Sequence, residues 1–159
     1  MKGIKAFKIG QFQTDERKLS VLVQAFYSAW MLAFLFEGQI LYSFSALYRF
    51  DPTILVASNV AANYIGMVSC GIFIKTKRAA KRLLISTYLF SMAVSVLFFF
   101  KPSISWMIGT VVASLLAGAS IAAWGFFLKS GTPKNERIKT VADLLIISNI
   151  LMIGISLAT

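Results

Sequence analysis

Glu37 and three asparagines, Asn59, Asn63 and Asn149, stand inside otherwise apolar stretches of this sequence. If such a stretch crosses a membrane, a carboxyl group within it must be paired, solvated or protonated, and is by default a candidate for ion or solute handling. Asn59 and Asn63 are spaced i, i+4, so a helix would place both amides on one face. The four side chains predict a substrate or ion pathway in which Glu37 faces Asn59. The alternative is that Glu37 sits hydrogen-bonded at a rim and the asparagines join helices.

The usual enzymatic and metal-binding constellations are excluded by composition. The chain has no histidine and a single cysteine, Cys70. Neither a Ser-His-Asp or Cys-His site nor the common zinc, haem and iron–sulfur ligand sets can be assembled from such a chain. We therefore predict a protein that is not an enzyme and holds no metal or other cofactor. Cys70 has no partner for a disulfide within the chain and is interpreted as a small packing residue.

The composition predicts that a lipid bilayer surrounds the elements that position these residues. Of 159 residues, 58% are hydrophobic and 14% are charged, and the mean hydropathy is +0.76. These values lie far outside the range of soluble domains, because a water-soluble fold of this size has too little interior for so much apolar surface. We expect an all-α membrane protein.

Five stretches without Lys or Arg are long enough to cross a bilayer core of about 30 Å. They run over about 20–47, 52–74, 83–100, 103–128 and 141–157. Residues 1–18 are predicted to be a basic leader, and 19–159 a transmembrane domain of five helices. Asp51-Pro52 and Lys101-Pro102 mark two of the connections, because proline favours the first turn of a helix and interrupts the interior.

The positions of the 16 basic residues predict the orientation in the membrane. All but Arg49 and Lys101 fall in the leader, in 75–82 or in 129–139. By the positive-inside rule these three segments are cytoplasmic, so the N-terminus is expected inside a multi-pass protein of the plasma membrane. A net charge of +10 also suits nucleic-acid binding. That interpretation is disfavoured because the charges lie at the ends of apolar stretches and not along one helix face.

Two spans differ in their predicted surroundings. Span 103–128 is rich in small residues, which let helix backbones approach closely, and we expect it to be central. Its small residues are Gly109, Ala113, Ser114, Ala117, Gly118, Ala119, Ser120, Ala122, Ala123 and Gly125. Span 83–100 has no strongly polar residue and ends in an aromatic cluster, which predicts a peripheral, lipid-facing helix.

A basic segment between two short hairpins carries a resemblance. Gly71 is followed by Lys77-Arg78-Ala79-Ala80-Lys81-Arg82, with basic residues at 77, 78, 81 and 82. This arrangement resembles the N-terminal half of a major facilitator superfamily transporter, whose signature has a Gly followed by an Asp-Arg-x-Gly-Arg-Lys type run. The basic residues are kept here, while the Asp and the second Gly are lacking.

The resemblance implies a fold and a function. The fold would be the first five helices of a six-helix bundle, with Gly71, Lys77, Arg78, Lys81 and Arg82 in the cytoplasmic signature loop. The function would be that of the N-terminal portion of a secondary transporter, which moves a small solute by alternating access. Its partners would be the bilayer, the solute and the missing C-terminal helices of the same protein. The alternative is a non-transporting sensor or anchor domain of a longer regulatory protein.

Overall fold

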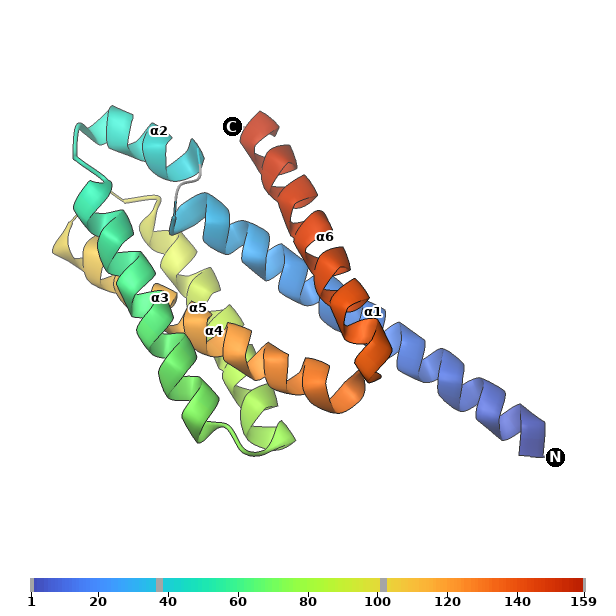
Figure 1. The fold of residues 1–159 in the computed structure, drawn as a ribbon. Helices are drawn as coiled ribbons and strands as arrows, with labels where there is room; N and C mark the ends of the chain where they lie inside the picture. Colours follow the sequence, from blue (N-terminus) through green and yellow to red (C-terminus); the bar gives the residue numbers. More distant parts are fainter. Residues whose placement is uncertain (1, 37–38, 101–102, 159) are drawn as a thin grey trace.

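A computed structural model describes residues 2–36, 39–100 and 103–158, which form helices joined by short connections (Figure 1). The elements in chain order are α1 (Lys2–Phe34), α2 (Gln39–Tyr48), α3 (Thr53–Phe73), α4 (Lys77–Leu97), α5 (Ile104–Gly131), the short 3-10 helix η1 (Lys134–Glu136) and α6 (Arg137–Ala158). None of these described residues lies in a β-strand.

Four helices of the described chain are long and apolar enough to cross a membrane. They are α3, α4, α5 and α6 with its leading turn η1, and the segment Lys18–Phe34 of α1 is a shorter apolar helix. Large apolar side chains such as Phe73, Phe99 and Leu157 are exposed on the outside of the fold. The coarse prediction, a helical chain with several helices suited to a bilayer, is confirmed.

The stretch 20–47, predicted as one span, is divided in the structure between two helices. α1 ends at Phe34 and α2 begins at Gln39. A single helix over 20–47 would be about 42 Å long, well beyond a bilayer core of about 30 Å. The division shortens the continuous segment, and α2 packs its buried Leu41 into the main hydrophobic core. The predicted leader 1–18 is, from Lys2 onward, the first half of α1.

Local side-chain contacts set the other helix ends. The backbone N–H of Thr53 donates to the Asp51 carboxylate at 2.9 Å, which satisfies a donor at the start of α3. Hydrogen bonds from the side chain and then the backbone of Thr53 lower the pKa of Asp51. The Thr76 hydroxyl accepts from the N–H of Ala79 at 3.3 Å and caps α4. The helix α4 therefore begins at Lys77, and not near residue 83 where the apolar stretch starts.

The helix α5 is central, as its small residues predict, and it packs most extensively on α3. A Cβ atom added at Gly118 would lie 2.7 Å from the carbonyl carbon of Asn63 on α3. One added at Gly66 would lie 2.8 Å from the carbonyl carbon of Leu115 on α5. Because both neighbours are backbone atoms, the two helices approach as closely as glycine allows.

The five long helices fall into two groups. One consists of α3, α4 and α5, with α5 between the other two, and the second is the pair α1 and α6. The backbone of α1 comes close to α5 at few positions, and large α1 side chains such as Tyr27 and Met31 fill the space in the main core. Figure 1 shows α6 crossing α1, while the first half of α1 projects beyond the bundle.

Candidate functional site

The predicted pathway residues Asn59 and Asn63 join three helices. Asn59 is fully buried, and its Nδ2 donates to the backbone oxygen of Leu35 at 2.8 Å. The Nδ2 of Asn63 donates to the backbone oxygen of Ser114 at 3.3 Å and lies 3.7 Å from the sulfur of Met31. The structure therefore brings these two amides together on the face of α3 that meets α1 and α5. The Oδ1 atom of Asn59 has no partner among the described atoms.

The other two predicted pathway residues do not join this cluster in the structure. Glu37 lies outside the described residues. Asn149 is exposed on α6, and its Nδ2 donates to the Leu145 oxygen of the same helix at 2.8 Å. A role for either residue in a pathway stays a prediction.

The predicted signature loop is largely helical. Gly71 lies in the last turn of α3, and the connection to α4 consists of residues 74–76. Lys77, Arg78, Lys81 and Arg82 occupy the first turns of α4, and all four are exposed. Lysine and arginine are good helix formers, so a basic run need not be a loop. Of these four side chains, Lys77 lines a cavity.

Four hydrogen bonds between side chains join α1 to α4 and α5 at successive levels. Trp124 Nε1 donates to Ser20 Oγ at 3.2 Å, and Tyr88 Oη donates to Gln24 Oε1 at 2.7 Å. Tyr27 Oη and Ser91 Oγ form a hydrogen bond at 3.2 Å, and Trp30 Nε1 donates to Ser95 Oγ at 2.8 Å. We call these eight residues the polar seam. It is the interface at which the two helix groups meet.

The seam follows from the spacing of polar residues on two helices. Ser20, Gln24 and Tyr27 are spaced i, i+4, i+7 on α1, so they share one face. From Ser20 to Trp30 the seam rises about 15 Å, roughly half of a bilayer core. The α4 partners give this helix a polar inner face, which the prediction of a peripheral, lipid-facing helix did not include. The serine and tyrosine spacing in 88–95 is the sequence signal that would have revealed it.

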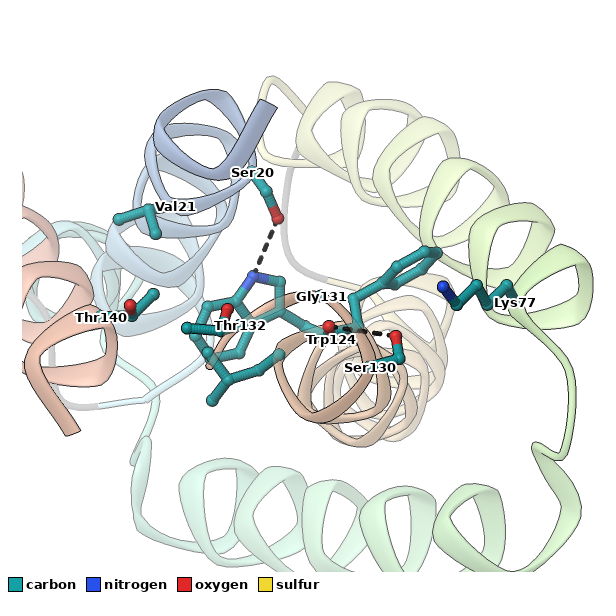
Figure 2. Close-up of a pocket in the computed structure, with 10 residues that line it drawn as sticks. Ser20, Val21, Lys77, Trp124, Ser130, Gly131, Thr132 and Thr140 are labelled. Atoms are coloured by element: carbon teal, nitrogen blue, oxygen red, sulfur yellow. Dashed lines mark hydrogen bonds between the residues drawn. The ribbon is translucent and has the colours of Figure 1, made fainter. Parts of the chain in front are cut away.

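A cavity of about 300 Å³ opens at one end of the seam, between the two helix groups (Figure 2). We call it the basal cavity. Its polar lining residues are Ser20, Lys77, Trp124, Ser130, Thr132 and Thr140. In Figure 2 the indole of Trp124 is bonded to Ser20 on one side, and Lys77 approaches from α4 on the other. The cavity thus lies where the basic starts of α4 and α6 meet the end of α5.

Charge in this cavity is positive. Lys77 is the one charged residue among the described side chains that line it. Two carbonyl oxygens at the end of α5 accept hydrogen bonds from Arg137. Its Nη2 donates to the Lys129 oxygen at 2.6 Å, and its Nε donates to the Thr132 oxygen at 3.0 Å. Thr132, which is 7% exposed, contributes a hydroxyl-bearing side chain to the lining.

Comparison with known protein families, curated proteins and solved structures finds no match to this chain. The resemblance to the major facilitator superfamily therefore stays a prediction. Function has to be inferred from the polar seam, the basal cavity and the way in which the helices are grouped.

Proposed function

We propose that this chain is part of a membrane transporter that moves a small polar solute by alternating access. The observation that carries the proposal is the division of the helices into two groups that meet at the polar seam, with the basal cavity between them at one end. A transporter needs such an interface, because rigid groups of helices rock against each other around a central path.

Motion of one helix group against the other requires weaker contacts between the groups than within them. Hydrogen bonds between helices in membranes average about 0.6 kcal/mol each, so the four bonds of the seam contribute about 2 to 3 kcal/mol. The contact between the groups also includes the Asn59 bond to Leu35 and the packing of Tyr27 and Met31 in the main core. Conformational equilibria in proteins commonly span a few kcal/mol. The close backbone contact at Gly66 and Gly118 instead fixes α3 to α5, so these two helices should move as one body.

The same proposal sets the orientation. The basic starts of α4 and α6 and the end of α5 surround the basal cavity, so the positive-inside rule places this cavity on the cytoplasmic side with the N-terminus. A solute would enter from the cytoplasm and travel along the seam once the groups part. The membrane in question is the plasma membrane.

Thiol labelling tests this motion without knowledge of the solute. Single cysteines are placed at Ser91 in the seam and at Ser114 in the α3–α5 contact, in a Cys70→Ser background, and the protein is reconstituted in liposomes. Both serines are buried. We expect an impermeant thiol reagent to label Ser91→Cys from either side of the membrane, because the seam opens alternately. Ser114→Cys serves as the matched control and should stay unlabelled.

Equal protection of the two cysteines would refute alternating access at the seam. The second candidate function would then be favoured, a sensor or anchor domain of a longer regulatory protein. A separate observation supports that candidate: α1 is one helix of 33 residues, about 50 Å long, whose first half extends beyond the bundle. A continuous helix of this kind can connect a membrane domain mechanically to a cytoplasmic partner.

A further inference from the structure

We infer that the basal cavity binds a phosphate group, with Lys77 as its counter-charge. This inference rests on the proposed function, because it names the chemical class of the solute that enters the cavity. The lining contains one cationic side chain and hydroxyl groups, and the described lining residues include no Asp or Glu. Such a set favours an anion with several acceptor oxygens over a cation or a neutral sugar.

Two hydroxyl groups in the cavity can donate to such an anion. Thr132 is more than nine-tenths buried and lines the cavity. Its hydroxyl group can donate a hydrogen bond to a ligand oxygen. The Ser20 hydroxyl accepts a hydrogen bond from Trp124 Nε1 and can itself act as a donor.

The surrounding backbone and charges add to the positive potential. Lys77 is the first residue of α4, so the positive end of that helix lies at the cavity wall. The guanidinium of Arg137 covers the carbonyl oxygens of Lys129 and Thr132, which would otherwise repel an anion. The nearby carboxyl group of Asp143 lines a neighbouring cavity that also contains Lys18 and Lys139.

The size and the apolar lining limit the ligand further. A volume of about 300 Å³ is at the small end of the range for ligand pockets. Phe127 and Leu128 also line the cavity and would contact a short apolar part of the ligand. Two sources of the phosphate fit this description, a free phosphorylated solute and the headgroup of an anionic phospholipid.

Binding by the purified full-length chain in neutral detergent tests the inference. The probes are inorganic phosphate, dihexanoyl phosphatidylglycerol and, as the zwitterionic reference, dihexanoyl phosphatidylcholine. The variants are Lys77→Gln and Thr132→Val, and the matched control is Lys81→Gln, which removes an exposed charge one turn later on α4 outside the cavity. We expect Lys77→Gln to raise the Kd for the bound probe at least tenfold, because a hydrogen bond to a charged group is lost. Thr132→Val should raise it severalfold, while Lys81→Gln should change it little.

Each possible binding result either supports or overturns the inference that the basal cavity binds phosphate. Saturable binding of inorganic phosphate that depends on Lys77 supports a free solute, and binding of phosphatidylglycerol alone with the same dependence supports a lipid headgroup. Absence of binding, or an equal loss in Lys77→Gln and Lys81→Gln, overturns the inference. Because Lys77 is exposed, its variant should fold, and Thr132→Val provides an independent check. The Ser91→Cys labelling does not involve phosphate, so failure here is distinguishable from failure of the transport proposal.

Discussion

Alanine in place of Gly118 should separate two helices that glycine holds in contact. The new methyl carbon would lie 2.7 Å from the carbonyl carbon of Asn63 and 2.8 Å from the backbone nitrogen of Met67. Carbon atoms reach their best separation at about 3.5 to 4.0 Å, so α3 and α5 would have to part by about 1 Å. Neither neighbour is the tip of a flexible side chain that can turn aside.

The expected cost follows from this geometry. Overpacking a well-packed core costs about 1 to 3 kcal/mol, and a clash with backbone atoms belongs at the upper end of that range. For a domain of this size, about 3 kcal/mol lowers the Tm by about 6 to 12 °C. Gly66→Ala should lower it similarly, because its methyl carbon would lie 2.8 Å from the Leu115 carbonyl carbon.

Two further glycines provide matched controls. Gly125 lies on α5 with Gly118, and Gly71 lies on α3 with Gly66, yet a Cβ at either control position would meet nothing within 4 Å. Alanine favours a helix over glycine by about 1 kcal/mol, so both controls should keep or raise the Tm. The measurement is thermal unfolding in detergent, followed by the fluorescence of the native tryptophans. If Gly118→Ala and Gly66→Ala unfolded at the same temperature as the controls, the close α3–α5 contact would be disproved.

Three smaller perturbations can be followed in the same unfolding assay. Asn59→Ala should lower the Tm by about 1 to 3 °C, because it removes a buried hydrogen bond between helices, whereas Asn149→Ala should leave it unchanged, since that amide bonds within its own exposed helix. Equal effects would contradict these placements. Arg137→Lys should lower the Tm by about 2 to 4 °C, because a lysine cannot bridge two carbonyl oxygens in the manner of a guanidinium, and an unchanged Tm would argue against this cap. The lowered pKa of Asp51 in the folded state means that its stabilising effect is complete above the unfolded value of 3.8 and is lost as the pH falls through the lower folded value. Asp51→Ala should therefore have a shallower loss of Tm than the wild type below about pH 4, and parallel curves would show that this carboxylate does not stabilise α3.

Much of the helical layout could be predicted from hydropathy and from the positions of proline and charged residues. The stretches 52–74 and 103–128 match α3 and α5 closely, because proline and charged residues lie at their ends. The helix α4 starts before the uncharged stretch 83–100, because lysine and arginine are good helix formers. The division between α1 and α2 depends on how α2 packs into the core, which no local pattern indicates.

The candidate site was harder to predict than the fold. Residues that are costly in a membrane stand out in the sequence, and the structure shows that two of them, Asn59 and Asn63, form hydrogen bonds between helices. The polar seam is built from serine, tyrosine, tryptophan and glutamine, each of which is unremarkable alone in a membrane helix. Their function in the interface depends on which helices are neighbours, for example Tyr27 against Ser91, which are 64 positions apart. Sequence periodicity gives the face of a helix but not its partner.

Pulsed electron spin resonance in a bilayer tests the motion of the two helix groups most directly. Spin labels at Leu22 of α1 and Lys81 of α4 report between the groups, and labels at Val60 of α3 and Val112 of α5 report within one group. All four side chains are exposed, and the background is Cys70→Ser. We expect two populated distances for the first pair and one for the second. A single narrow distance for both pairs would contradict the proposal that the seam opens and closes.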